Sequence, residues 1–489
     1  MEIEELINQR RQKLQNLANL GVESFSRTPQ GRVIIGEILN DFKEGQKPIL
    51  AGRITAKRSH GKVLFLDLKD STGKIQLYIK ENIVGAEKFS ICLELDIADF
   101  IAVSGETFKT HTGEPTLKLE EVTVLAKAMR PLPEKWHGLK DVEVRYRQRY
   151  LDLISNDEVK EVFIKRSRII KAVRDFLDAR RFLEVETPMM HNIPGGASGR
   201  PFKTFHNEYS MDLYLRIAPE LYLKRLLVGG LDRVYEINRS FRNEGVSTRH
   251  NPEFTMLEVY AAYADYEDMM KLCEELFFSV AKEVLGTAEI IYQGKPINLT
   301  PPWPRCSFAK MVEEKFGIAA SDEAHVMLTK LQAKGKAMGL NKLSRTQVAK
   351  IIEELLEEEM GVSPTFVTDY FTDMCPLAKK RKDNPLLAER FELYVAGLEV
   401  GNAYSELNDP TEQKQRFEEE LAALPAEEKK CVDLDYVIAL EHGMPAAGGL
   451  GIGIDRLIML LTDQPAIRDV ILFPLLRPAK PEKETECAG

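Results

Sequence analysis

The first residues of the chain repeat apolar and charged positions with the period of a helix. Between residues 2 and 20, Glu, Arg and Lys separate apolar side chains that recur every three or four positions: Ile3, Leu6, Ile7, Leu14, Leu17 and Leu20. In an α-helix this spacing gathers the apolar side chains on one face. It predicts an amphipathic helix packed on a neighbouring surface, with an RNA-binding arm as the alternative. We expect residues 1–47 to hold this helix and a lead-in.

The period changes to alternation between residues 48 and 127. Five stretches alternate apolar and polar residues as strands do: 49–58, 62–70, 74–80, 99–110 and 116–127. Gly-containing turns join neighbouring strands, and a helical stretch at 86–95 separates the third strand from the fourth. Five strands with a helix at this place is the order of an OB-fold barrel, although other small barrels also have five strands. We therefore expect an OB-fold over residues 48–127.

A second, larger domain follows a linker. Residues 128–140 carry two Pro and a Gly, which is typical of a linker. The elements predicted after it are a helix at 166–181, a strand at 182–188, strands within 232–263, a helical insertion at about 305–360, strands at 390–406, and a strand and helix at 448–462. They predict an α+β domain over 141–478, and residues 479–489 have the composition of a disordered tail.

Composition excludes several classes of protein. The chain of 489 residues is 44% hydrophobic and 29% charged, which excludes a wholly disordered, collagen-like or coiled-coil protein. Its net charge of −9 restricts any RNA contact to a local basic surface. Six Cys without a C-x-x-C pair predict reduced thiols and no zinc site. With a charged N-terminus and no apolar run near the ~20 residues that span a bilayer, we expect a cytoplasmic protein without membrane contact.

A segment rich in charged residues is the first candidate for chemistry. Residues 241–254, FRNEGVSTRHNPEF, form the predicted turn of a long hairpin that gathers Arg242, Glu244, Arg249, His250 and Phe254. A guanidinium donates paired hydrogen bonds to phosphate oxygens. An aromatic ring stacks on a purine, and a carboxylate accepts from its exocyclic amine. A solvated surface hairpin is the alternative interpretation.

A Gly-rich strand is the second candidate. In residues 446–460, AAGGLGIGIDRLIML, the glycines allow a ligand or another backbone to approach the strand closely. Arg456 stands where the strand passes into an apolar helix, so its side chain can reach a cleft. The pattern lacks the third Gly and the βαβ setting of a dinucleotide-binding fingerprint. We therefore reject a dinucleotide-binding site as the interpretation of these glycines.

These segments together resemble a known family. Residues 166–190, 241–254 and 449–456 are similar to motifs 1, 2 and 3 of class II aminoacyl-tRNA synthetases. The amino-terminal barrel is similar to that of the members that charge Asp, Asn or Lys. IPGGASGRPF (193–202), RIAPELYLKRL (216–226) and EVGNAYSELND (399–409) resemble the lysine-specific members of bacterial type. The resemblance covers about residues 10–478.

The resemblance implies a fold and an activity. The fold is a six- to seven-stranded antiparallel sheet flanked by helices, with motif 1 at the two-fold interface of a homodimer. The activity is ATP-dependent ligation of L-lysine to tRNA(Lys) through a lysyl-adenylate, with release of AMP and pyrophosphate. Alternatives are a lysyltransferase acting on a protein acceptor, whose relatives lack the barrel, and a non-catalytic tRNA-binding paralogue, which typically loses motif residues present here.

The resemblance also implies roles for individual residues. Arg242 contacts the lysine carboxylate and the ATP α-phosphate, Phe254 and Arg456 enclose the adenine, and Arg242 and Arg456 are the catalytic pair. The implied ATP site comprises Arg242, Asn243, Glu244, His250, Asn251, Phe254, Glu399 and Arg456. The implied lysine site comprises Gly196, Glu220, Arg242, Glu258, Tyr260, Asn402, Tyr404 and Glu406. Taken singly, each of these residues is more often structural.

Two further sites follow from the same resemblance. Glu392 and Glu399 match metal carboxylates, which suit Mg²⁺ beside phosphates. A hairpin turning at Ala396-Gly397 would place Tyr394 opposite Glu399, with Glu392 diagonal to it on the same face. Arg58, Phe65 and Gln76 match anticodon-binding positions, although Phe65 could instead belong to the barrel core. Lys57 stands where many relatives have a second Arg, and it keeps the positive charge but not the paired hydrogen bonds of a guanidinium.

Overall fold

Two units make up the chain, Met1–Lys140 and Asp141–Gly489, and each is described by itself. The computed structural model describes residues 3–132, 139, 141–197, 199–423 and 432–478. Most of the predicted linker (133–138 and 140) and the predicted tail (479–489) lie outside these residues. No helix in the described part of the chain is long and apolar enough to cross a membrane.

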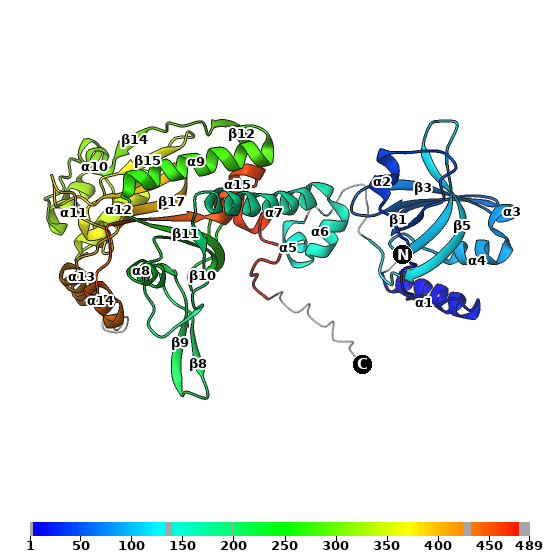
Figure 1. Ribbon diagram of the computed structural model, residues 1–489, viewed down its shortest axis with the longest axis horizontal. Coiled ribbons are helices and arrows are strands. Elements are labelled where there is room, and N and C mark those ends of the chain that lie inside the picture. The colour runs from blue at the N-terminus through cyan, green and yellow to red at the C-terminus, as the bar shows by residue number, and fades with distance from the viewer. Residues whose placement is uncertain (1–2, 133–138, 140, 198, 424–431, 479–489) are drawn as a thin grey trace. The chain divides into compact units, whose positions relative to one another are not determined.

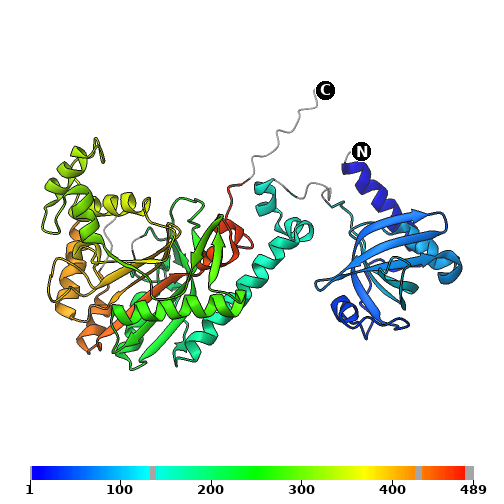
Figure 2. The same ribbon diagram turned by 90° about the horizontal axis from the view of Figure 1, so that it is seen from above.

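The first unit is a closed barrel whose strands follow the predicted alternation. Its strands are β1 Ile49–His60, β2 Val63–Lys69, β3 Lys74–Lys80, β4 Phe100–Lys109 and β5 Pro115–Ala126, closed in the order β1-β2-β3-β5-β4. Alternate side chains such as Leu64, Leu66 and Leu68 fill the interior and are fully buried. Helices α3 (Glu81–Val84) and α4 (Ala86–Glu94) stand between β3 and β4, which confirms the predicted OB-fold order (Figures 1 and 2).

The amino-terminal helix packs on this barrel. Helix α1 (Ile3–Asn19) buries Leu17 in the barrel core and contacts α4. Arg10 donates to the carbonyl oxygens of Ala128 and Ile97, and Lys13 pairs with Asp96 at 2.5 Å. The packed-helix interpretation is therefore confirmed. The lead-in also contains the short helix α2 (Ile35–Asn40).

An eight-stranded sheet forms the centre of the second unit. Its order is β14 (Arg305–Ser307), β15 (Thr365–Thr368), β16 (Arg390–Val395), β17 (Leu398–Ser405), β18 (Ala447–Gly453), β11 (Glu253–Ala262), β10 (Arg233–Phe241) and β6 (Leu183–Glu184). The inner pairs are antiparallel, as expected, whereas the pairs β14–β15 and β10–β6 are parallel. Six or seven strands were expected. The sheet has eight because the short strands β14 and β6, of three and two residues, add one strand at each edge.

Helices cover both faces of this sheet. Tyr235 and Val259 belong to the core under α7 (Asp157–Asp178), α9 (Tyr266–Leu285) and α15 (Ile454–Thr462), which Figure 1 shows along one side. Their neighbours Val234 and Tyr260 point to the opposite face and pack with α8 (Glu220–Val228) and α14 (Leu434–Glu441). This alternation separates a structural face from the face that carries the site.

Peripheral elements complete the unit. The predicted helical insertion contains α10 (Phe308–Phe316), α11 (Ala324–Ala333) and α12 (Arg345–Glu357), which stand at one end of the unit in Figure 2. They share a core with side chains of the sheet such as Val367 and Tyr394. The remaining elements are α5 (Val142–Arg147), α6 (Arg149–Ser155), β7 (Met190–His191), β8 (Lys203–His206), β9 (Met211–Leu215), β12 (Glu289–Tyr292), β13 (Lys295–Asn298) and α13 (Pro410–Ala423).

Two predicted boundaries are wrong. The helix expected from residue 166 begins at Asp157, because Val159 and Val162 extend its buried face towards the N-terminus. The strand expected over residues 182–188 is limited to Leu183–Glu184, where it pairs with the edge of β10.

Candidate active site

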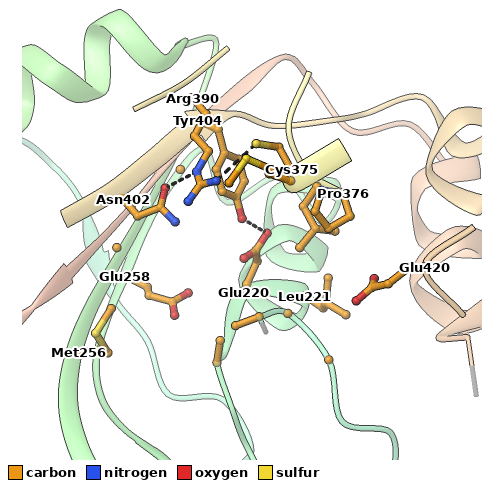
Figure 3. A pocket seen from close by; sticks show the side chains of 18 of the residues that line it. Glu220, Leu221, Met256, Glu258, Cys375, Pro376, Arg390, Asn402, Tyr404 and Glu420 are labelled. Carbon is orange, nitrogen blue, oxygen red and sulfur yellow. Dashed lines mark hydrogen bonds between the residues drawn. The ribbon is translucent and has the colours of Figure 1, made fainter. Parts of the chain in front are cut away.

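A cavity of about 770 Å³ lies on the α8 face of the large sheet. Its wall is formed by β17, β18 and β11, by the start of α8, and by α12 and α13. All eight residues predicted for lysine binding line it: Gly196, Glu220, Arg242, Glu258, Tyr260, Asn402, Tyr404 and Glu406. Asn402 and Tyr404 reach the same cavity because alternate residues of β17 share one face (Figure 3). Glu406, directly after the end of β17, continues this alternation and also lines the cavity. The predicted residues are thus brought together from five separate segments.

The buried end of this cavity is strongly acidic. Tyr404 donates its hydroxyl to Glu220 Oε1 at 2.5 Å, and Tyr260 donates to Glu258 Oε2 at 3.1 Å (Figure 3 shows Glu220, Tyr404 and Glu258). Burial raises the pKa of Glu258 to about 8, and the charge of Glu220 adds to the shift. The carboxyl groups of Glu220, Glu258 and Glu406 at this end of the cavity favour a cationic ligand, because a cation offsets the repulsion between their charged forms.

The glycines of β18 have a specific use in this pocket. A Cβ atom at Gly449 would lie 1.9 Å from Glu406 Oε1 and 2.6 Å from Cε1 of Tyr260. The fully buried Glu406 carboxylate therefore lies directly on the strand where any other residue would place a side chain. A group approaches the Gly-rich strand closely at this position, as predicted, but the group is a side-chain carboxylate of the protein and not the expected ligand or backbone.

A smaller cavity of about 110 Å³ adjoins the first and shares Arg242, His250 and Glu399 with it. Seven of the eight residues predicted for ATP binding line it: Arg242, Glu244, His250, Asn251, Phe254, Glu399 and Arg456. Asn243 is exposed and lines neither cavity, and its backbone N–H donates to the carbonyl of Arg200 at 2.8 Å. Its neighbours Arg242 and Glu244 face the cavity, so the structure does not bring Asn243 into this set.

Two arginines and a histidine define the electrostatics of the smaller cavity. Arg456 donates from Nη1 to the backbone oxygen and Oε2 of Glu399, and its Nη2 lies 3.2 Å from His250 Nε2. Arg242 lies with its guanidinium carbon 5.2 Å from the centre of the Phe254 ring, and its buried Nε has no hydrogen-bond partner. Burial lowers the pKa of His250, and the positive charge of Arg456 adds to the shift. The cavity thus offers two cations and an aromatic face.

The strand register at the predicted metal position is largely as expected. Tyr394 stands opposite Glu399, as predicted, but a bulge before it places Glu392 opposite Asn402. Glu392 and Glu399 both line the larger cavity. Glu392 accepts hydrogen bonds from Tyr370 at 2.8 Å and Tyr394 at 2.7 Å, and it pairs with Arg390.

Two carboxylates of the insertion join these residues and were missed by the sequence analysis. Glu353 and Glu357, one turn apart on α12, also line the larger cavity. Burial raises the pKa of Glu353 to about 8, with a contribution from Glu392, and its Oε1 has no hydrogen-bond partner. In the described residues no cluster of three or more His, Cys, Asp or Glu side chains has the arrangement of a metal site. Paired carboxylates fit Mg²⁺, which is held by one or two carboxylates and by phosphate oxygens.

The barrel brings the three predicted anticodon residues to its outer surface. Phe65 lies between the fully buried Leu64 and Leu66 and so faces outward, half-buried, opposite Arg58 on β1 and Tyr78 on β3. Gln76 stands opposite Asp67, to which Arg58 donates at 2.7 Å. The interpretation of Phe65 as barrel core is therefore wrong.

The same surface contains residues that the sequence analysis did not single out. Tyr78 lies 5.4 Å from Phe65 and 5.9 Å from Phe108, measured between ring centres, so three aromatic rings form a row. Lys57 has a different place, since its ammonium donates to the carbonyl oxygens of Leu93 and Leu95 near the end of α4. The positive charge of Lys57 is therefore directed towards carbonyl oxygens of the same unit.

The sheet, the Arg-bearing loop between β10 and β11 and the Gly-rich strand β18 define a class II aminoacyl-tRNA synthetase. Residues 141–477 match the family described as tRNA synthetases class II (D, K and N), and residues 49–125 match the OB-fold nucleic acid binding domain. The chain is 55% identical to the lysine–tRNA ligase of Carboxydothermus hydrogenoformans over 485 residues, 98% of this chain and 99% of that protein. The chain therefore belongs to the lysine–tRNA ligase family of class II tRNA synthetases.

Other relatives agree over the same length. The lysine–tRNA ligase of Pelotomaculum thermopropionicum is 53% identical over 487 residues, 98% of this chain and 96% of that protein. That of Thermotoga maritima is 48% identical over 494 residues, 99% of this chain and 98% of that protein. The similarity thus extends through both units.

Proposed function

We propose that the protein ligates L-lysine to tRNA(Lys) in two steps. The lysine carboxylate attacks the α-phosphorus of ATP, the bond to the β-phosphate breaks, and lysyl-adenylate and pyrophosphate form. A terminal hydroxyl of the tRNA then attacks the activated carbonyl and AMP leaves. The observation that carries this proposal is Arg242, which lines both the acidic cavity and the cavity with the aromatic and basic walls.

The first step needs no general base, because a carboxylate is already a nucleophile. The residues of the site bind and orient the two substrates and neutralise charge. Arg242 would contact the lysine carboxylate and the α-phosphate together, Phe254 and Arg456 would hold the adenine between them, and Glu244 would accept from its amino group. His250, which neighbours Arg456, would lie by the terminal phosphates.

Selection of lysine would depend on the acidic end of the larger cavity. Glu406, Tyr260 and Glu220 would surround one ammonium group of the substrate, with Glu258 near the α-amino group. Glu392 and Glu399 would hold Mg²⁺, which when bound neutralises phosphate charge. The neighbouring Glu353 and Glu357 line the same part of the cavity.

The direct test is ATP–pyrophosphate exchange with each of the twenty amino acids, followed by charging of tRNA(Lys). We expect lysine alone to support rapid exchange. Exchange with no amino acid would favour the non-catalytic paralogue. Exchange with lysine but no charging of tRNA would favour a different acceptor.

The aromatic surface of the barrel leads to a prediction about tRNA. Replacing Phe65 by Ala should weaken charging of tRNA(Lys) by about 1–3 kcal/mol, the contribution of one stacked base, and should spare lysine-dependent exchange. Both half-reactions are measured in parallel. Phe25→Ala, at an exposed phenylalanine of the same unit, is the control. Equal damage to both half-reactions by Phe65→Ala would indicate a structural role instead.

We also propose that the protein is a homodimer, because the segment 166–190 resembles motif 1. The segment itself exposes the large apolar side chains of Leu183, Met189 and Met190. Light scattering at micromolar concentration should give twice the mass of one chain. A stable species of 55.5 kDa, the mass of a single chain, would contradict the proposal.

A further inference from the structure

A lysine of the protein itself lies behind the acidic end of the larger cavity. Lys224, on α8, is fully buried, and its Nζ lies 2.6 Å from Glu220 Oε1 and in contact with Glu406 Oε2. Glu220 and Glu406 line the cavity, whereas Lys224 is not among the described residues that do so. The ammonium therefore meets both carboxylates from the side away from the substrate space.

The surroundings of Lys224 hold it in the charged form. Its Nζ lies 5.4 Å from the centre of the Tyr404 ring. The buried Tyr436 also contributes to raising the pKa of Lys224. Burial alone lowers the pKa of Lys224, but the charges of Glu220 and Glu406 outweigh burial and raise it above its ordinary value. A buried ammonium is tolerated only with such partners.

Glu406 uses its two oxygens differently. Oε2 meets Lys224, while Oε1 lies over Gly449 and beside Tyr260, buried and without a hydrogen-bond partner. Glu220 is also fixed, because its Oε1 accepts from both Lys224 and Tyr404. One oxygen of Glu406 is therefore held by the protein, and the other remains for a ligand.

We propose that Lys224 is a positioning residue that keeps Glu220 and Glu406 both ionised and sets the net charge of the substrate pocket. This inference deepens the proposed function and rests on it. Glu220 and Glu406 together with Lys224 leave one negative charge. Glu258, whose pKa burial raises to about 8, supplies a second negative charge when a substrate ammonium lies beside it, and L-lysine brings two ammonium groups. Without Lys224, the neighbouring carboxylates would share a proton, as paired carboxylates do. A substrate ammonium would then have to displace that proton.

The test compares Lys224→Met with Lys224→Arg in lysine-dependent pyrophosphate exchange. Lys224→Met should raise the KM for lysine about tenfold or more, because removing one partner of a buried charge pair weakens binding strongly, and should change the KM for ATP little. Its lysine KM should also fall as pH rises, since the shared proton is then lost. The wild type and Lys224→Arg, which retain the charge, should show a smaller dependence on pH. Lys330→Met, which removes a lysine paired with Asp322 in the insertion, is the matched control.

A double-mutant cycle separates this role from packing. Lys224→Met combined with Glu406→Gln removes one positive and one negative charge and so restores the net charge of the wild-type pocket. Its lysine KM should therefore be no higher than that of Glu406→Gln alone, within about twofold. This comparison remains available if Lys224→Met alone does not fold.

The outcomes distinguish the inference from the proposed function. Absence of exchange with lysine in the wild type would contradict the function itself. With normal wild-type exchange, the inference is overturned by an unchanged lysine KM in Lys224→Met, by an equal rise of the KM for ATP, or by additive effects in the cycle.

Discussion

Replacing Arg242 by alanine should abolish formation of lysyl-adenylate while leaving the fold intact. Arg242 lines both cavities, and its buried Nε has no partner in the protein. The guanidinium is thus available to the charge that develops on the α-phosphate as the carboxylate attacks. Loss of one such group should reduce the rate of pyrophosphate exchange by about 10²–10³ or more.

Arg239→Ala is the control for this variant. Arg239 lies on β10, three residues before Arg242, which follows the end of that strand. It pairs loosely with Glu253 at 3.8 Å, outside both cavities. It should retain exchange activity, and both variants should have the circular dichroism and melting temperature of the wild type. Near-normal exchange by a folded Arg242→Ala variant would contradict the role given to this residue.

Short-range patterns in the sequence were sufficient for much of the fold. Alternation along residues 49–127 predicts which side chains fill the barrel, because a closed sheet has only an inside and an outside. The same period predicts that Asn402, Tyr404 and Glu406 share one face, as they do. The edge strand β14 was beyond this reasoning, since three residues show no period, and the strand predicted over residues 182–188 was too long for the two residues of β6.

The missed residues of the site depend on contacts between distant segments. Lys224 follows Glu220 by one helical turn, but its contact with Glu406 joins residues 182 positions apart, which no local pattern can show. Glu353 and Glu357 lie in a run of glutamates that has the composition of a solvated helix, and only the folding of α12 onto the sheet brings them to Glu392. In both cases the helical pattern predicts the helix correctly, but only tertiary packing brings its charged side chains to the site.

Lysine has a long side chain that ends in an ammonium, which loses its hydration on entering a closed pocket. That loss is tolerable only where anions and hydrogen-bond acceptors replace the water. Glu406 is fully buried, and its Oε1 lacks a partner within the protein, so it can supply this opposing charge. Tyr260 lies beside that oxygen, and Glu220 stands nearby across Lys224.

Replacing Glu406 by glutamine should therefore raise the KM for lysine by tens-fold or more and change that for ATP little. Removing one partner of a buried charge pair costs about 2–5 kcal/mol, partly because the other charge is left unpaired, and about 1.4 kcal/mol corresponds to a factor of ten. Discrimination against norleucine should fall at the same time, because the penalty that this neutral analogue meets at Glu406 disappears. Pyrophosphate exchange with lysine and with norleucine measures both effects. The control is Glu275→Gln, which changes a glutamate of α9 that pairs with Arg180. An unchanged lysine KM in a folded Glu406→Gln variant would show that this carboxylate does not meet the substrate ammonium.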